Sequence, residues 1–121
     1  MSYVRKAECK PIEHMVGGPG RVLSSSLIEG PETLFHSGRL FAHSILEKDC
    51  GIGFHTHTDE CELYYILKGE AEYNDNGQVR TVSAGDITYT GPGESHSLTN
   101  RRDEPVEIIA LILYSQQRKP E

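Results

Sequence analysis

Apolar runs of strand length recur along this chain, and turns rich in Gly, Pro and Asn separate them. Several runs alternate apolar and polar positions, as a β-strand with one buried face does. No segment of useful length shows the 3.6-residue period of a helix. We expect strands over the following segments: 21–28, 39–46, 62–67, 78–82 and 107–114. The pattern therefore predicts an all-β fold, either a closed barrel or a two-sheet jelly roll.

The segments between and beyond these strands complete the expected layout. Asn74 to Gly77 is predicted to form a tight hairpin turn, because Asn-Gly tolerates positive φ at both central positions. Residues 1–20 are predicted to form an irregular arm, and the polar segment 115–121 to fray. At 121 residues we expect one domain. Its parts are an N-terminal arm with the first strands (1–35), a barrel (36–115) and a tail (116–121).

The densest group of metal-ligand side chains lies just before the strand expected at 62–67. His55 and His57 are two residues apart, so on a strand they share a face, with Cβ atoms about 6–7 Å apart. Two such imidazoles can converge on one ion. The polar segment 58–61 is interpreted as a loop, after which Glu62 returns on the next strand. Two imidazoles and a carboxylate favour a divalent transition metal. The alternative is a solvated His-x-His pair without a metal, because surface loops produce such pairs too.

A second signal lies downstream of the first. His96 follows a glycine-proline turn, Gly91-Pro92-Gly93, at the start of a strand that alternates apolar and polar residues. This position makes His96 the natural fourth ligand. A separate histidine delivered by its own hairpin strengthens the metal hypothesis over a chance pair.

These residues resemble the two sequence motifs of the cupin family, G-x5-H-x-H-x3,4-E-x6-G and G-x5-P-x-G-x2-H-x3-N. The matching residues are His55, His57, Glu62 and Gly69 in the first motif and Gly85, Gly93, His96 and Asn100 in the second. Asp49 stands where the first motif opens with glycine, and Gly91 stands where the second has proline. Both departures affect turn geometry and leave the ligand positions intact.

The resemblance implies a cupin double-stranded β-helix, or jelly-roll barrel, and a homodimer. It also implies a mononuclear centre with the ligands His55, His57, Glu62 and His96. This ligand mix admits Mn, Fe, Co, Ni, Cu or Zn. Open coordination positions suit a small polar or carboxylated metabolite, with decarboxylase, dioxygenase, isomerase or lyase chemistry. The alternatives are a non-catalytic module that binds a small molecule or a metal, and a structural cupin with a vestigial site. Whether the chain is an enzyme stays open at this point.

Strand parity selects the side chains around Glu62. If this carboxylate faces inward, Tyr64 and Ile66 also face inward. Cys61 then faces the opposite way, so we interpret it as a small buried hydrophobe and not as a ligand or nucleophile. The phenol of Tyr64 can donate a proton or a hydrogen bond, which makes it the candidate catalytic group.

Parity acts in the same way on the strand of His96. If this imidazole faces inward, Leu98 and Asn100 do as well. His43 lies on another expected strand, and parity leaves it undecided between the pocket and the outer side. The predicted substrate pocket consists of Tyr64, Ile66, Leu98 and Asn100, with His43 as a further candidate.

Composition limits the partners and the setting. The formal net charge is −6, which argues against nucleic acid and anionic membranes, since both attract fields of Lys and Arg. No apolar run approaches the roughly 20 residues of a membrane-spanning helix. The first residues are too polar for a signal peptide. Three cysteines without C-x-x-C spacing favour reduced thiols and a cytoplasmic location.

Overall fold

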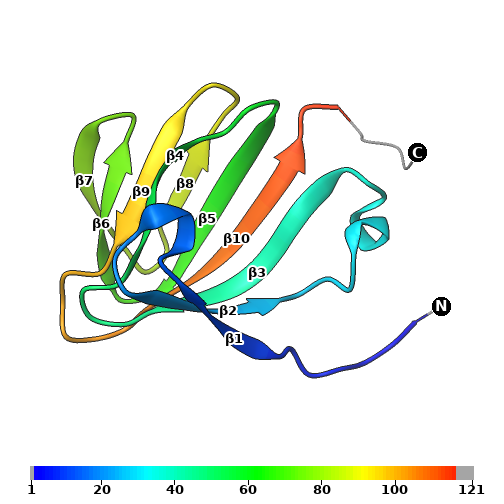
Figure 1. The fold of residues 1–121 in the computed structure, drawn as a ribbon, viewed down its shortest axis with the longest axis horizontal. Coiled ribbons are helices and arrows are strands. Elements are labelled where there is room, and N and C mark those ends of the chain that lie inside the picture. Colours follow the sequence, from blue (N-terminus) through cyan, green and yellow to red (C-terminus); the bar gives the residue numbers. More distant parts are fainter. Residues whose placement is uncertain (1, 117–121) are drawn as a thin grey trace.

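The computed structural model describes residues 2–116 and shows two antiparallel β-sheets (Figure 1). The larger sheet has the strand order β1-β2-β3-β10-β5-β8, and the smaller one has the order β4-β9-β6-β7. The strands in the described part of the chain are β1 (Cys9–Glu13), β2 (Arg21–Ser26), β3 (Gly38–Leu46), β4 (Gly51–Thr56), β5 (Glu60–Lys68), β6 (Glu70–Asp75), β7 (Gln78–Ser83), β8 (Ile87–Thr90), β9 (Ser95–Thr99) and β10 (Val106–Tyr114). Two short 3-10 helices are η1 (Met15–Gly17) and η2 (Pro31–Leu34). The predicted all-β fold of two sheets is confirmed.

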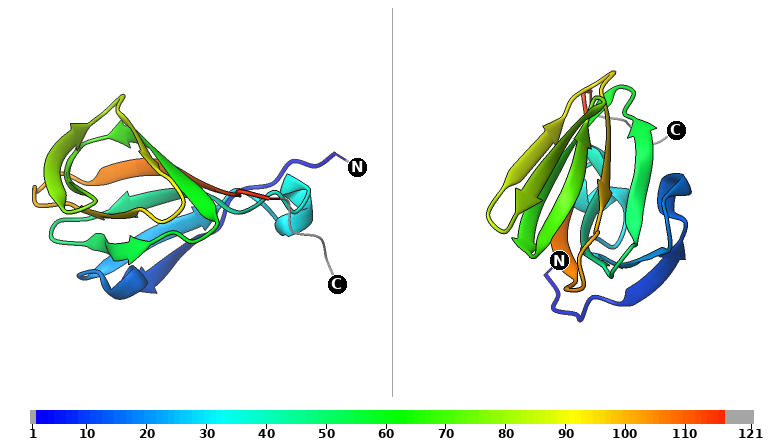
Figure 2. Two further views of the ribbon diagram at one scale, coloured as in Figure 1. Left: turned by 90° about the horizontal axis from the view of Figure 1, so that it is seen from above. Right: turned by 90° about the vertical axis from the view of Figure 1, so that its left-hand side faces the viewer.

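The two sheets stack as layers with their inner faces toward each other (Figure 2). The β6–β7 hairpin lies at one end of the molecule, and β3 and β10 extend toward the opposite end (Figure 1). In the larger sheet β10, the last strand, pairs with β3 on one side and β5 on the other. Strands distant in sequence therefore meet in the middle of the large sheet.

Alternation along β5 and β10 builds this core. Tyr64 and Ile66 of β5 are at most 1% exposed, and Ile108 of β10 is fully buried. The residues that alternate with them along each strand face the other side of the sheet, because successive side chains of a strand point to opposite faces. The structure thus shows the facing that parity predicts for β5. Leu98 of β9, which is also fully buried, contributes to the core from the smaller sheet.

The N-terminal arm is more ordered than the sequence indicates. Residues 9–13 form the edge strand β1, which pairs with β2 and places Pro11 opposite Leu23. An edge strand tolerates proline because one side of its backbone needs no partner. All five residues of β1 are exposed, so it lacks the buried apolar positions that reveal a strand in sequence. Our prediction of an irregular arm is therefore wrong for this segment.

The start of β5 also differs from the prediction. The strand begins at Glu60, so the turn after β4 is shorter than the predicted loop 58–61. Asp59 makes the turn with a φ of 58°, a left-handed conformation that Asp and Asn adopt more readily than most residues. This shift brings Glu60 onto the strand, on the same face as Glu62.

The hairpin turn between β6 and β7 is as predicted. Asn76 and Gly77 have φ values of 53° and 96°, as a turn with two left-handed positions requires. The amide of Gly77 donates a 2.7 Å hydrogen bond to the side chain of Asn74. The Asn-Gly prediction is confirmed.

The short helix η1 lies against β4 through glycine backbones. A Cβ atom on Gly18 would lie 2.4 Å from the carbonyl oxygen of Gly51, and one on Gly53 would lie 2.1 Å from that of Val16. Only glycine permits such close approach of two backbones. These glycines therefore fix η1 next to the strand that carries His55.

Two further observations concern the ends of the chain and its helices. Within residues 2–116, the structure contains no helix with the length and apolar character needed to cross a bilayer. Most of the predicted frayed tail, residues 117–121, lies outside the described residues.

Candidate metal centre

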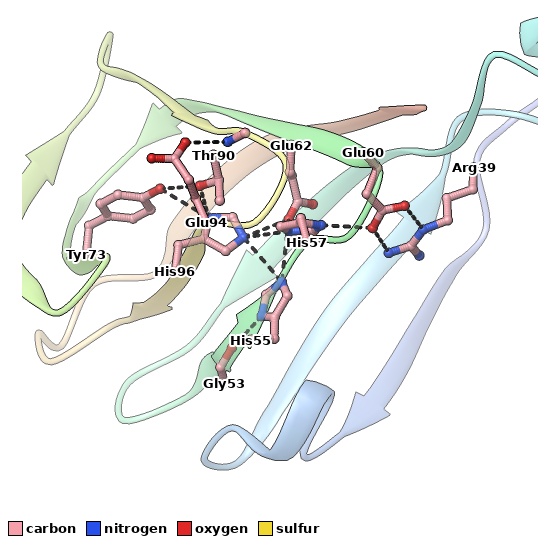
Figure 3. Close-up of polar contacts among 11 residues, drawn as sticks. Arg39, Gly53, His55, His57, Glu60, Glu62, Tyr73, Thr90, Glu94 and His96 are labelled. Atoms are coloured by element: carbon pink, nitrogen blue, oxygen red, sulfur yellow. Dashed lines mark hydrogen bonds and ion pairs between the residues drawn. The ribbon is translucent and has the colours of Figure 1, made fainter. Parts of the chain in front are cut away.

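Four potential metal ligands converge between the two sheets (Figure 3). His55 lies near the end of β4, and His57 follows just after that strand. His96 lies on β9 directly opposite His55 in the ladder. Glu62 comes from β5 of the other sheet. The group therefore bridges the two layers, and only the folded sandwich brings it together.

The distances among these side chains are short. The Nε2 atom of His96 lies 2.9 Å from Glu62 Oε1, 3.1 Å from His57 Nε2 and 3.2 Å from His55 Nε2. Glu62 Oε1 is also 3.0 Å from His57 Nε2 and 3.7 Å from His55 Nε2. Three of the side chains are buried, and His55 is partly exposed. The four ligand atoms are close enough to share one ion.

Two of the imidazoles are held by a contact at Nδ1, the ring nitrogen that does not face the centre. Nδ1 of His55 lies 2.6 Å from the carbonyl oxygen of Gly53, and Nδ1 of His57 lies 2.9 Å from Oε1 of Glu60. A carbonyl and a carboxylate only accept hydrogen bonds. We therefore assign the proton of each neutral ring to Nδ1, which leaves the Nε2 lone pair directed at the centre.

The third imidazole has hydroxyl partners. Nδ1 of His96 lies 2.8 Å from Thr90 Oγ1 and 3.1 Å from the Tyr73 hydroxyl. A hydroxyl can accept the Nδ1 proton, so the same tautomer is available to this ring. Three imidazole lone pairs then face one another and one carboxylate oxygen. Lone pairs at this separation repel unless a proton or a cation lies between them.

The donor set and its spacing fit a divalent transition metal. With metal–nitrogen bonds of 2.0–2.1 Å, two ligands at right angles on an octahedral ion lie about 3.0 Å apart. The separations of 2.9–3.2 Å around His96 match this value. Imidazole and carboxylate suit such ions, and a cation would remove the repulsion among the lone pairs. The residues present therefore fit the implied metal.

The electrostatics of the group favour a bound cation. Burial acts to raise the pKa of Glu62, but the contacts with His55 and His96 in their protonated forms outweigh it and lower the pKa to about 2. Burial lowers the pKa of His96. Burial also acts to lower the pKa of His55, but hydrogen bonds with Glu62 and Gly53 outweigh it, and the pKa rises. Protons and a metal would compete for the same lone pairs.

A fifth side chain, Glu60, supports the centre from behind. It accepts hydrogen bonds of 2.8 and 2.7 Å from Nε and Nη2 of Arg39 as well as the one from His57 (Figure 3). The hydrogen bond from Arg39 outweighs burial and lowers the pKa of Glu60 to about 2. An ionised carboxylate on Nδ1 fixes the ring orientation of a ligating histidine and raises its basicity.

Sequence reasoning missed Glu60 and Arg39. Glu60 lies two residues before Glu62, so strand parity would have placed both on one face. Our assignment of 58–61 to a loop hid that signal. The contact between Arg39 and Glu60 spans 21 residues, and no local pattern in the sequence indicates it.

A cavity of about 370 Å³ adjoins the ligands. His55 and Glu62 form part of its wall, and so does Tyr64. The ring of Tyr64 stacks on that of His96 with centroids 4.9 Å apart, and burial raises the pKa of its phenol well above the usual range. The apolar part of the wall consists of Met15, Val16, Leu40, Ala42, Ile52, Ala110 and Ile112. The site thus combines a metal-binding edge with an apolar interior.

Only some of the predicted pocket residues lie on the wall of the cavity. Tyr64 lies on the cavity wall, whereas Ile66 and Leu98 are fully buried in the core and are not part of the wall. Parity identifies inward-facing residues but not which of them reach the cavity. Cys61 lies on the opposite face of β5 from Glu62, as expected, but it is partly exposed and not a buried hydrophobe.

The remaining two residues have other partners. The amide of Asn100 donates hydrogen bonds of 2.9 and 2.8 Å to the carbonyl oxygens of Leu46 and Glu104, so we assign it to fastening a turn and not to the pocket. His43 alternates with wall residues of β3 and lies 3.0 Å from Oε1 of Glu107. We therefore place His43 on the outer side of the larger sheet.

Comparison with known proteins gives consistent matches. The family model of the Cupin domain matches residues 42–112. The oxalate-binding protein of Thermotoga maritima is 39% identical over 112 residues, which cover 91% of this chain and 92% of that protein. The uncharacterized HTH-type transcriptional regulator YdiP of Escherichia coli is 31% identical over 91 residues, 71% of this chain but 30% of that protein. A solved structure of a predicted oxalate decarboxylase from Thermotoga maritima superimposes with a TM-score of 0.88 at 36% identity, covering 93% of this chain and 99% of that one.

Proposed function

This chain belongs to the cupin family, and we propose that it binds one divalent transition metal ion, which in turn holds a small chelating carboxylate. The observation that carries the proposal is the convergence of three imidazole nitrogens and one carboxylate oxygen beside a cavity. A bound ion with open positions is a Lewis acid that orients and polarises oxygen ligands. Oxalate chelates through two adjacent oxygens, and the relative from Thermotoga maritima is named for binding it.

The proposal gives each side chain of the centre a role. His55, His57, Glu62 and His96 would hold the ion. Glu60 would keep the ring of His57 in the orientation and tautomer that ligation requires. The cavity would exclude bulk water from the bound carboxylate, which strengthens every electrostatic contact inside it.

Calorimetric titration of oxalate tests this function. We expect saturable binding to protein loaded with Mn²⁺, Co²⁺, Ni²⁺ or Zn²⁺, and none after the metal has been removed with a chelator. His57→Ala should abolish both metal and oxalate binding. His43→Ala, a histidine of the outer face, should leave both unchanged. If oxalate binds to none of the loaded forms, the proposal fails.

Decarboxylation is a second candidate, favoured by the phenol of Tyr64 on the cavity wall and by the likeness to a predicted oxalate decarboxylase. Cleavage of the carbon–carbon bond of oxalate releases CO₂, and the remaining carbon takes up one proton to give formate. Tyr64 is the hydroxyl nearest in sequence to the ligand Glu62 on the inner face of β5, and we propose it as the proton donor.

Formate release separates the two candidates. An enzyme would convert oxalate to equal amounts of formate and CO₂, and Tyr64→Phe would slow this turnover while oxalate still binds. Tight oxalate binding without formate, whichever metal is loaded, would favour the non-catalytic module instead.

We also propose that the protein is a homodimer. The outer face of the larger sheet carries two apolar rows that cross its strands. We call the outer apolar face the set Phe41, Ile45, Leu63, Tyr65, Ile87, Tyr89, Ile109, Leu111 and Leu113. Ile87 is 68% exposed and Tyr89 is 58% exposed. An apolar face of this extent, interrupted on β3 and β10 by the His43–Glu107 pair, is typical of a homodimer interface, and a two-fold axis would place it against its own copy.

The cysteines support the cytoplasmic location that we propose. Cys9, Cys50 and Cys61 are all unpaired in the structure. Free thiols persist in a reducing compartment such as the cytoplasm.

A further inference from the structure

The cavity beside the metal centre is much larger than oxalate requires. Its volume of about 370 Å³ corresponds to the space of about twelve water molecules in the liquid. Oxalate consists of two carboxylate groups and nothing more, and chelation would hold it at the edge formed by His55 and Glu62. Most of the cavity would then remain for another part of the ligand.

That remaining space is mainly apolar, although the hydroxyl groups of Ser24, Ser44 and Thr56 also lie on its wall. Ala42 of β3 and Ala110 of β10 are cross-strand partners on the cavity wall. Both are at most 3% exposed, and their short side chains leave room between the sheets. Leu40, Ile52 and other apolar side chains form the surfaces around them. A hydrocarbon group entering this space would leave water for an apolar surface, which favours its binding.

The charges on the wall argue against a second anionic group on such a ligand. Besides the two ligands His55 and Glu62, the charged side chain on the described part of the wall is Arg39. Its Nε and Nη2 atoms are both engaged by Glu60. A distal carboxylate in the cavity would therefore find only the Nη1 group of a guanidinium whose charge Glu60 already balances, and burial of an anion without a full counter-charge is costly.

The charge of the metal centre also favours a ligand with a single negative charge. A divalent ion with the Glu62 carboxylate and three neutral imidazoles carries one net positive charge. A monoanionic chelator makes this group neutral, whereas oxalate makes it negative. A buried, water-poor site favours the neutral combination.

We infer that the preferred ligands of this site are monocarboxylates that chelate through a neighbouring 2-oxo or 2-hydroxy oxygen and carry an apolar tail. The chelating oxygens lie at the edge formed by His55 and Glu62, and the tail occupies the apolar space around Ala42 and Ala110. The inference rests on the proposed function, because it takes the metal centre as the anchor.

A series of linear 2-oxo acids tests the tail. Pyruvate, 2-oxobutyrate, 2-oxopentanoate and 2-oxohexanoate are titrated calorimetrically into the Co²⁺-loaded protein, with oxalate measured in parallel. Each added methylene should tighten binding by about fourfold, as expected for full burial of a CH₂ group. 2-Oxoglutarate has the chain length of 2-oxopentanoate with a terminal carboxylate, and it should bind at least tenfold more weakly than that ligand.

A variant that fills the cavity tests where the tail lies. Ala42→Leu should remove the gain along the series, so that 2-oxohexanoate binds no more tightly than pyruvate, while metal content and oxalate affinity stay unchanged. Ala84→Leu, the same change on an exposed turn after β7, should keep the full gain. Far-ultraviolet circular dichroism and metal content show whether Ala42→Leu has kept its fold, and the series on the unaltered protein stands without it.

The outcomes separate this inference from the proposed function. Oxalate binding without any gain along the 2-oxo acid series would overturn the inference alone. A 2-oxoglutarate affinity equal to or above that of 2-oxopentanoate would also overturn it. If neither oxalate nor any 2-oxo acid binds to the loaded protein, both conclusions fail together.

Discussion

At the scale of single residues, the centre depends on which nitrogen of each imidazole is free. Gly53 and Glu60 hold the Nδ1 protons of His55 and His57, so the Nε2 lone pairs face inward. The ligand residues alone do not produce this arrangement. The acceptors behind them do, and Glu60 is the one that carries a charge. Its contact with Arg39 is therefore part of the metal centre.

We predict that Glu60→Gln weakens metal binding by about 10- to 100-fold, the usual effect of losing a hydrogen-bonded carboxylate behind a ligating histidine. The amide keeps the shape of the side chain but loses the charge that holds His57 and Arg39. Competition with a chromogenic chelator measures the affinity. Glu72→Gln, at an exposed ion pair with Arg101, serves as the control. Equal affinities of the two variants would show that Glu60 has no positioning role.

The sequence predicted the four converging side chains better than their surroundings. Spacing locates His55 and His57 because alternation is local, and the polar segment after them locates Glu62 at the start of the next strand. Glu60 and Arg39 depend on where β5 starts and on a contact between distant strands. Parity places Asn100 on the inner face, but parity does not show what the side chain contacts. Its amide fastens a turn and does not line the cavity.

At the scale of elements, η1 and β4 form one wall unit. Backbone contacts at Gly18 and Gly53 hold η1 against the strand of His55, and Met15 of η1 lies on the cavity wall. Apolar runs of strand length predicted the long strands β3, β5 and β10, because one face of each is buried. They missed β1, whose residues are all exposed and include a proline. An edge strand without a buried face has no apolar positions at a regular spacing, so the sequence does not indicate it.

We predict that Gly18→Ala lowers the free energy of unfolding by about 1–3 kcal/mol, the usual cost of forcing an extra group into a packed contact. The new methyl group would lie within 2.4 Å of the Gly51 carbonyl oxygen and push η1 away from β4. Urea denaturation measures the change. At Gly30, where φ is −174°, a methyl group meets only the flexible carboxylate of Glu32. Gly30→Ala should therefore be nearly neutral, and an equal loss in both variants would contradict the close contact.

At the scale of the whole molecule, the two faces of the larger sheet have different tasks. The inner face carries Glu62 and builds the core and the cavity. The outer apolar face has no covering layer among the described residues, as the edge views show (Figure 2). The proposed homodimer would bury this face and leave the metal centre between the sheets untouched.

We predict that the double variant Tyr65→Lys and Ile87→Lys is monomeric, because the two residues are cross-strand partners on the outer apolar face and two charges there cannot be buried without partners. Sedimentation equilibrium measures the mass. Val79→Lys, at a 60% exposed position of the smaller sheet, should remain dimeric. A monomeric unaltered protein, or a double variant that stays dimeric, would contradict the proposed interface.

Metal analysis of the purified protein tests the central claim most directly. After loading with Co²⁺ and removal of excess ion, we predict one equivalent of metal per chain, lost entirely in His96→Ala and retained in His43→Ala. An unaltered protein without bound metal, or a His96→Ala variant that retains its full equivalent, would contradict the claim.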